Sequence, residues 1–468
     1  MHIKIEKLIY EGWGLGRTPE GKPIFVKKSV PGDLIDVEIV KDKKSYFEGR
    51  IMKIIKPSSR RINSLCPHFD RCGGCDHQNI AYPNQLKFKE EIFRETMARQ
   101  GIESDILPIV PGSNEELYYR NTIRFFFINE NGKTNFAMHD FEDSKKMIPI
   151  EGCLLQSKTC NSILKALRET FNDCSRQSKK NNYSSSEGGK FSNNETIEQC
   201  NNVFSSLWQL RVREGKFTNE FMVEIITSSR ELPLRQEIVD TLKSITGVKS
   251  IYHTIALNKS NYNWQRRLIF GSPIIYEKAG KFTFQLSPES FFQTNSLGLK
   301  TLYDKIKEFA EIKMGDRILD LYCGTGTIGI YLSTLAKNVV GVELVQSAIN
   351  DANANSRINK LSNCEFICAD TMSWLKQYGN SAMKQFDKII LDPPRQGLGK
   401  KIIEDLSKLY EFSGFSSLEL IYTSCNPATF ARDIKEFEKR DFKLKKVQPI
   451  DMFPMTHHIE CVGILCRG

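Results

Sequence analysis

The stretch Asp320-Leu321-Tyr322-Cys323-Gly324-Thr325-Gly326-Thr327-Ile328-Gly329 decides how the C-terminal part of the chain folds. An apolar run typical of a strand precedes it, and a helical pattern follows it. Its glycines have the spacing G-x-G-x-x-G, which permits a tight turn and lets a ligand approach the backbone closely. We therefore predict a nucleotide-type loop between a β-strand and an α-helix, with Gly324 and Gly326 against the ligand.

Apolar strand-like runs alternate with helical segments on both sides of this loop. Such a pattern indicates a parallel sheet that is covered on both faces, as in Rossmann-like α/β folds. The last run, at 459–465, follows a loop rather than a long helix, so we expect that strand to be antiparallel. The other expected strands lie at 317–322, 339–343, 364–368, 388–391 and 420–423.

Three acidic residues flank the expected loop. Glu343 closes the second strand, where a carboxylate accepts hydrogen bonds from ribose hydroxyls of either a dinucleotide or S-adenosylmethionine. Asp320 precedes the glycines, and its charge suits the amino group or the sulfonium of S-adenosylmethionine better than a pyrophosphate. Asp370 follows the third strand, where it is placed either to meet an adenine amino group or to cap a helix.

Two further motifs fall at the same carboxyl edge of the sheet, where open α/β folds bind ligands. The fourth strand ends in Asp392-Pro393-Pro394-Arg395, a stiff loop that dehydrogenases do not need and that nucleobase methyltransferases often have. The fifth ends in Ser424-Cys425-Asn426-Pro427. A cysteine at a strand end is usually small core filler, but beside these two loops we interpret Cys425 as a nucleophile.

Methylation of uracil at carbon 5 requires a nucleophile, and Cys425 can supply it. Carbon 5 of uracil is a poor nucleophile, and addition of a thiolate to carbon 6 turns the ring into an enolate whose carbon 5 attacks a methyl donor. A base must then remove the carbon 5 proton so that the thiol can leave. Our candidate is Glu460, in His457-His458-Ile459-Glu460; the alternative for Glu460 is an ordinary surface carboxylate.

As a set, these segments resemble the RNA uridine C5-methyltransferases. The resemblance implies an S-adenosylmethionine site lined by Gln293, Tyr322, Glu343 and Asp392. It also implies that Cys425 is the nucleophile and Glu460 the base. The matching pieces are Ser287-Pro288-Glu289-Ser290-Phe291-Phe292-Gln293-Thr294-Asn295, Asp320 to Gly326, Asp392 to Arg395, Ser424 to Pro427 and His458-Ile459-Glu460.

A cysteine cluster lies nearer the N-terminus. Cys66, Cys72 and Cys75 have the spacing C-x5-C-x2-C, the adjacent glycines 73 and 74 permit a tight loop, and Cys153 supplies a fourth thiol. Four thiolates suit zinc or an iron–sulfur cluster, but the five-residue gap fits paired zinc knuckles poorly. Family members with this pattern carry a four-iron four-sulfur (4Fe-4S) cluster, so we favour that cofactor over zinc.

The N-terminal segment is basic and rich in short strands. Residues 1–61 carry 14 Lys and Arg against 8 Asp and Glu, in a chain of net charge +10. Expected strands at 2–9, 23–26, 34–40 and 47–55, with glycines between them, predict a small OB-like β-barrel. Residues 1–57 resemble a TRAM domain, which implies RNA as the partner, and Arg120, Arg124, Arg211 and Arg213 are further candidates for phosphate contacts.

We therefore expect three domains. They are a TRAM-like RNA-binding barrel at 1–57, a central α+β domain with the iron–sulfur cysteines at 58–285, and a class I S-adenosylmethionine-dependent methyltransferase domain at 286–468. A helix is expected at 82–99. A polar insert at about 173–202 is too poor in apolar residues to fold, so we expect a disordered loop there.

Composition excludes several classes of protein. No stretch approaches the ~18 consecutive apolar residues of a membrane span, and the N-terminus has no apolar signal core. The 13 cysteines are an odd number scattered along a long chain, which favours a reducing cytosol over a secreted disulfide framework. We expect a cytoplasmic monomer without membrane contact.

The expected activity is methylation of uridine carbon 5 in RNA. The barrel and the cysteine cluster together resemble the 23S rRNA branch of the family more than the tRNA branch, which lacks both in its best-known bacterial form. A tRNA uridine-54 enzyme and a cytosine C5-methyltransferase remain as enzymatic alternatives. Rivals from other classes are a non-catalytic RNA-binding protein and an iron–sulfur oxidoreductase that binds NAD.

Overall fold

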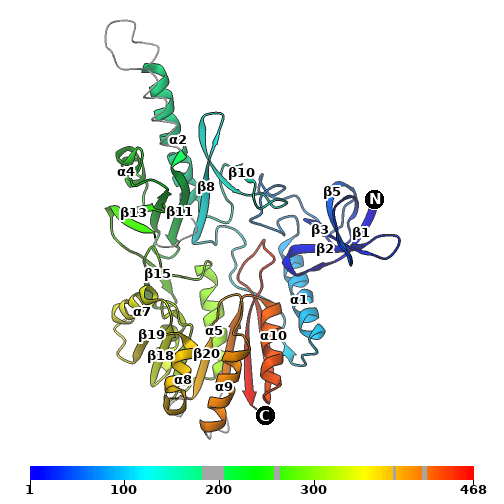
Figure 1. The fold of residues 1–468 in the computed structure, drawn as a ribbon, viewed down its shortest axis with the longest axis vertical. Coiled ribbons are helices and arrows are strands. Elements are labelled where there is room, and N and C mark those ends of the chain that lie inside the picture. Colours follow the sequence, from blue (N-terminus) through cyan, green and yellow to red (C-terminus); the bar gives the residue numbers. More distant parts are fainter. Residues whose placement is uncertain (182–204, 258–263, 383–385, 414–418, 468) are drawn as a thin grey trace.

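The computed structural model describes residues 1–181, 205–257, 264–382, 386–413 and 419–467. Figure 1 shows an N-terminal barrel, a central sheet with helices, and a C-terminal sheet layered between helices. The α/β class expected from the sequence is confirmed. No helix among these described ranges is long and apolar enough to cross a membrane.

The N-terminal strands close into a barrel in the order β1-β2-β3-β5-β4. The expected strands are confirmed, but β2 was not expected, because its glycines resemble turn residues. A Cβ on Gly14 would lie 2.0 Å from Ser29 Oγ, so the strand carries glycine where the barrel wall is crowded. The bounds are β1 (His2–Ile9), β2 (Trp13–Arg17), β3 (Pro23–Lys27), β4 (Leu34–Asp42) and β5 (Phe47–Lys56).

The central part is a seven-stranded sheet in the order β10-β9-β8-β11-β12-β13-β14. Its core packs against helices α2 (Lys158–Asn181) and α4 (Arg235–Lys243). The prediction of a disordered loop at about 173–202 is wrong for residues 173–181, because they continue α2. Residues 182–202 lie outside the described residues. The strands are β8 (Thr122–Glu130), β9 (Lys133–His139), β10 (Met147–Ile150), β11 (Leu207–Gly215), β12 (Glu220–Thr227), β13 (Val248–Ile255) and β14 (Gln265–Gly271).

The C-terminal sheet has the order β19-β18-β17-β20-β21-β23-β22-β6, with β7 also beside β22. Strands β19 to β21 are parallel, and β23 runs antiparallel to β21, as expected. Strands β22, β6 and β7 were not expected. The bounds are β6 (Asp105–Ile106), β7 (Val110–Pro111), β17 (Arg317–Leu321), β18 (Asn338–Glu343), β19 (Cys364–Cys368), β20 (Lys388–Leu391), β21 (Glu419–Ser424), β22 (Phe442–Asp451) and β23 (Glu460–Arg467).

Helices cover both faces of this sheet, because successive strand residues point to opposite sides. Leu319 and Leu321 pack into the core on one face, and Ile318 packs into the core on the other. The first face carries α1 (Tyr82–Arg99), α8 (Thr371–Ala382), α9 (Lys400–Ser413) and α10 (Pro427–Glu438). The second carries α5 (Leu299–Ala310), α6 (Thr327–Leu332) and α7 (Gln346–Ile358).

A short hairpin, β15 (Ile275–Ala279) and β16 (Phe282–Leu286), lies between the central and C-terminal sheets. The loop between β22 and β23 rises from the C-terminal sheet towards the other two parts (Figure 1). The buried ion pair between Lys89 and Asp451, 2.7 Å apart, ties α1 to the base of this loop. The site described next lies where this loop meets the barrel.

Candidate active site

The glycine loop stands at the point where the strand order reverses. β17 has β18 on one side and β20 on the other, and ligands bind at such a switch point in open α/β sheets. The loop after β17 has positive φ at Tyr322, Gly324 and Gly326. A Cβ on Gly326 would lie 2.7 Å from the Phe366 ring, so only glycine fits there. The predicted strand–loop–helix arrangement is confirmed.

Asp320 is a buried acid below the loop. Its Oδ2 accepts a hydrogen bond from the Gly329 N–H at 3.0 Å, whereas its buried Oδ1 has no partner within the described ranges. Burial, with a further contribution from the nearby Asp392, raises the pKa of Asp320 to about 8. A carboxylate with an unused lone pair in this environment is suited to a cationic ligand group.

Glu343 and Asp370 both bond to nearby backbone. Glu343 accepts hydrogen bonds from the N–H groups of Gly324 (3.3 Å) and Val345 (2.9 Å), which ties the end of β18 to the glycine loop. Asp370 caps α8 by accepting from the backbone and hydroxyl of Ser373. The capping alternative therefore holds for Asp370, and contacts of either carboxylate with ribose or adenine stay predictions.

Tyr322 belongs to the loop, and Gln293 belongs to a segment that contacts it. Burial raises the pKa of Tyr322 to about 12, and its hydroxyl faces Thr371 at the start of α8. Gln293 belongs to the segment 287–295, and Thr325 of the glycine loop donates a hydrogen bond to the Phe291 carbonyl of that segment. Both side chains are half-buried, as the lining of a cofactor site would be.

The structure brings Cys425, Glu460 and Asp392 together. Cys425 follows β21 and is half-buried, whereas Glu460 begins β23 and is 1% exposed. Burial, with a further contribution from the Glu460 carboxylate, raises the pKa of Cys425 to about 12, and the guanidinium of Arg395 opposes this shift. Glu460 is therefore not the surface carboxylate of the alternative interpretation.

The two acids of this group have raised pKa values as well. Burial raises the pKa of Asp392 to about 7. Burial and the proximity of Asp392 raise the pKa of Glu460 well above its usual range, against the effect of Arg395. The Oε2 of Glu460 is buried and has no hydrogen-bond partner among the described residues. A carboxylate of this kind is a stronger base than an exposed one.

Arg395 and the two histidines are functional candidates that the sequence analysis did not assign. Arg395 Nη2 lies 3.2 Å from His458 Nε2, and burial lowers the pKa of His458 to about 3, so this imidazole is neutral. His457 Nδ1 lies 2.7 Å from the Asp76 carboxylate, next to Cys75. A cation directly after Asp-Pro-Pro was the available signal for Arg395, whereas nothing local in the sequence connects Asp76 with His457.

Two of the arginines expected to contact phosphates form contacts inside the protein instead. Arg211 is buried, pairs with Glu224 and donates to the Pro288 carbonyl. Arg213 is buried and donates to the Ser287 carbonyl at 2.9 Å. The expectation is wrong for both, because they fix the segment 287–295 against the central sheet. Arg124 is exposed and stays a candidate for phosphate contacts.

The four cysteines of the predicted cluster lie near one another, beside the barrel. Burial raises the pKa of Cys75 to about 12 and of Cys153 to about 11, with smaller contributions from the thiols of Cys66 and Cys72. Gln78 Nε2 donates to the sulfur of Cys75 at 3.2 Å. In the described part of the chain, no group of three or more His, Cys, Asp and Glu side chains is arranged to hold a metal ion.

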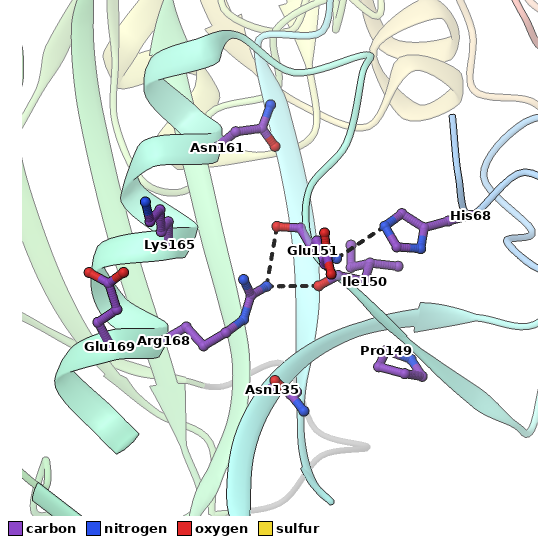
Figure 2. A pocket seen from close by; sticks show the side chains of 9 residues that line it. All are labelled: His68, Asn135, Pro149, Ile150, Glu151, Asn161, Lys165, Arg168 and Glu169. Atoms are coloured by element: carbon purple, nitrogen blue, oxygen red, sulfur yellow. Dashed lines mark hydrogen bonds between the residues drawn. The ribbon is translucent and has the colours of Figure 1, made fainter. Parts of the chain in front are cut away.

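A separate cavity of about 730 Å³ lies between α2 and the loop that carries His68 (Figure 2). Arg168 donates to the carbonyls of Ile150 (2.8 Å) and Glu151 (3.2 Å), and the Glu151 N–H donates to His68 Nε2 at 3.1 Å. None of its lining residues belongs to the group around Cys425. The cavity is therefore distinct from the candidate active site.

A doubly wound sheet with a glycine loop and an acid at the switch point defines a nucleotide-type site, of a kind that dinucleotide-binding enzymes and S-adenosylmethionine-dependent methyltransferases share. Comparison with known proteins narrows this choice. The family described as tRNA (Uracil-5-)-methyltransferase matches residues 265–467, and the TRAM domain matches residues 1–52. The chain belongs to the RNA uridine C5-methyltransferase family and is an S-adenosylmethionine-dependent RNA (uracil-5-)-methyltransferase.

Relatives match over nearly the whole chain. An "Uncharacterized RNA methyltransferase" of Caldanaerobacter subterraneus is 32% identical over 99% of this chain and 98% of its own length. Another "Uncharacterized RNA methyltransferase", of Halalkalibacterium halodurans, is 31% identical over 99% of this chain and 96% of its own length. The crystal structure of Pyrococcus abyssi tRNA (uracil-54, C5)-methyltransferase with S-adenosyl-L-homocysteine is similar with a TM-score of 0.72, at 29% identity and 99% coverage of both chains.

Proposed function

We propose that the chain methylates carbon 5 of a specific uridine through a covalent bond between Cys425 and carbon 6 of the base. The observation that carries this proposal is the meeting of Cys425, Glu460 and Arg395 at the edge of the sheet that bears the glycine loop. Arg395 favours the thiolate of Cys425 by its charge, and the thiolate adds to carbon 6 so that carbon 5 can accept the methyl group. The ionised Glu460, with its free Oε2, then takes the proton from carbon 5; the electrons of that C–H bond restore the double bond between carbons 5 and 6, and Cys425 leaves as a thiolate.

The cofactor site is proposed from the residues around the glycine loop. S-adenosylmethionine supplies the electrophilic methyl group when it is bound. Asp320 is buried and Asp392 is half-buried, both acids have raised pKa values, and a cationic ligand would relieve the cost of ionising both. Gly324 and Gly326 allow close approach of the ligand, and Gln293, Tyr322, Glu343 and Asp370 complete the proposed lining.

We propose that Cys66, Cys72, Cys75 and Cys153 hold a 4Fe-4S cluster rather than zinc. The five-residue gap between Cys66 and Cys72 fits paired zinc knuckles poorly, and N–H groups that donate to the sulfurs, as Gln78 does to Cys75, are typical of iron–sulfur sites. The cluster would supply no step of methyl transfer. It would hold the Cys75-Asp76 turn, on which His457 rests. Iron and sulfide analysis of protein prepared without air tests this assignment.

The RNA is proposed to reach Cys425 past the barrel. A cavity of about 1400 Å³ opens between the barrel and the cysteine loop, and Trp13, Lys27, Lys41, Arg50 and Arg71 contribute to its lining. Cationic and aromatic side chains together suit a single strand of RNA. The target uridine would leave its stack to enter the site, as in other enzymes that act on bases. The cytoplasmic location and monomeric state stay predictions.

The favoured substrate is 23S rRNA, and a tRNA uridine is the second candidate. The Pyrococcus abyssi structure favours the second, because a tRNA (uracil-54, C5)-methyltransferase matches this chain over 99% of both lengths. The barrel and the cysteine-bearing part therefore do not by themselves distinguish the two substrates.

The test uses the full chain, methyl-labelled S-adenosylmethionine, and separate 23S rRNA and tRNA from cells in which the gene has been deleted. We expect 5-methyluridine in one of the two RNAs, identified by mass spectrometry of nucleosides, and its loss with Cys425→Ala. Label in 5-methylcytidine, or no label with either RNA, would contradict the proposed function.

A further inference from the structure

Tyr10 lies in the turn that joins the first two strands of the barrel, η1 (Tyr10–Gly12). It is half-buried, and it packs against the core formed by the C-terminal sheet with α1 and α10 rather than inside the barrel. A barrel residue is thereby placed beside the methyltransferase domain. The barrel interior is filled by other residues, among them Ile5 and Val26.

The ring of Tyr10 faces the group around Cys425. It stands edge-on to the His457 ring, with the ring centroids 5.8 Å apart and the planes at 89°. The His457 ring lies against the His458 ring, with centroids 4.1 Å apart, and His458 Nε2 lies 3.2 Å from Arg395 Nη2. Burial raises the pKa of Tyr10 to about 12; the charge of Arg395 lowers it and that of Cys425 raises it, so both groups act on the hydroxyl. In the described part of the chain, no residue forms a hydrogen bond with this hydroxyl.

The turn is fixed against the cysteine loop. Gly12 has φ of 74°, and a Cβ there would lie 2.8 Å from the Cβ of Asp76, so the backbone sits directly on that residue. Lys27 donates to the Glu11 carbonyl at 2.5 Å and lies 3.8 Å from the Asp76 carboxylate. Asp76 in turn holds His457. Barrel, cysteine loop and active site are therefore joined around Tyr10 by short contacts.

We propose that Tyr10 contacts the target uracil and holds it in place over Cys425. The inference rests on the proposed function, because it assigns a residue to the same site. Its basis is the position of an aromatic ring and an unpartnered hydroxyl beside the thiol, on the domain proposed to bind RNA. An aromatic face packs against a flipped base, and a phenol can bond to a carbonyl of uracil. Tyr10 would be a positioning residue contributed by the barrel.

The experiment compares wild type, Tyr10→Ala, Tyr10→Leu and Tyr10→Phe as full-length proteins. The probes are rRNA and tRNA transcripts containing 5-fluorouridine, for adduct formation, and the unmodified transcript that the wild type methylates, for kcat and KM. Tyr46→Ala is the matched control, because Tyr46 lies on the same barrel and packs on Phe25, with ring centroids 5.0 Å apart. Binding of S-adenosylmethionine and thermal unfolding are measured for each variant.

We expect Tyr10→Ala and Tyr10→Leu to lower kcat/KM and the rate of adduct formation roughly tenfold to a hundredfold, as for loss of one aromatic contact to a base. Binding of S-adenosylmethionine should not change. Tyr10→Leu retains apolar packing, so it carries the test if the alanine variant does not fold. Activity retained in Tyr10→Phe would assign the contact to the ring, and activity lost there would assign it to the hydroxyl.

Two results would overturn the inference while the proposed function stands: adduct formation at the wild-type rate in Tyr10→Leu, or an equal loss in Tyr46→Ala. The second result would mean that the barrel contributes only general affinity for RNA. Failure of the wild type to form any adduct or to methylate any transcript would overturn both proposals together.

Discussion

Replacing Asp320 by asparagine should stabilise the free protein and weaken its binding of S-adenosylmethionine. Asp320 is fully buried, and its pKa is raised to about 8. A carboxyl with a raised pKa stabilises the fold below its unfolded pKa, and this contribution is lost as the pH rises through the folded pKa. The asparagine variant resembles the protonated acid at every pH, and its side-chain oxygen can still accept from Gly329.

The size of the effect follows from the pKa. The pKa of an aspartic acid in the unfolded chain is about 3.9, roughly three pH units below pH 7. Each unit corresponds to about 1.4 kcal/mol, so Asp320 lowers the free energy of unfolding at pH 7 by at most about 4 kcal/mol. Penetrating water and local relaxation reduce this effect, and we expect Asp320→Asn to be more stable than the wild type by about 1–3 kcal/mol at pH 7.

The assay is denaturant unfolding of both proteins at pH 5, 7 and 8.5, without ligand. The stability difference should grow with pH, while calorimetric titration should show at least a tenfold loss of S-adenosylmethionine affinity in the variant. A difference that is independent of pH, or undiminished affinity for the cofactor, would refute the assignment of Asp320 as the buried partner of a cationic ligand.

Three further predictions concern the surroundings of the thiol. Cys425 should react slowly with iodoacetamide near pH 8, because little of its thiol is ionised so far below a pKa of about 12, and its rate should rise about tenfold for each unit by which the pH is raised. The reaction should be slower still in Arg395→Met. Peptide mass spectrometry measures the rates, and an unchanged rate in the Arg395 variant would contradict the role given to its charge. Asp76→Asn should lower kcat and destabilise the protein at neutral pH, because the His457 partner outweighs the effect of burial and keeps the pKa of Asp76 below its usual range. The difference in unfolding free energy between the variant and the wild type should vanish as the pH falls through that low pKa. A difference that persists at such a pH would contradict the role given to the pair. Lys89→Met should cost about 3–5 kcal/mol of unfolding free energy, because it leaves a buried carboxylate unpaired, whereas Lys87→Met, exposed on the same helix, should cost little; similar losses in both would contradict this account.

The parallel strands of the C-terminal sheet were predictable, because each is an apolar run bounded by helical segments or loops. The glycine loop was predictable for the same local reason, since a φ above zero and the crowding at Gly326 demand glycine. Strand β2 was missed because its glycines resemble turn residues. Strands β6 and β7 have two residues each, too few for any period to show.

The chemistry of the site could be predicted only where residues are adjacent in sequence. Cys425 with Asn426-Pro427, and Asp392 with its prolines, carry their own signal. Tyr10, Asp76 and His458 reach the site through docking of the barrel and the cysteine loop against the β22–β23 loop, which lies hundreds of residues further along the chain. Arg211 and Arg213 were misassigned because a strand arginine that faces a buried glutamate has the same sequence signal as one that faces solvent.

The most direct test of the account is the covalent intermediate itself. Incubation with S-adenosylmethionine and the 5-fluorouridine form of its substrate RNA should yield a protein–RNA adduct that survives denaturation. A base can remove a hydrogen at carbon 5 as a proton, but it cannot remove a fluorine there, so the elimination that releases Cys425 is blocked. Mass spectrometry should map the RNA to the peptide bearing Cys425, and Cys425→Ala should yield none. A cross-link at any other cysteine, or an adduct that persists in the alanine variant, would contradict the central claim.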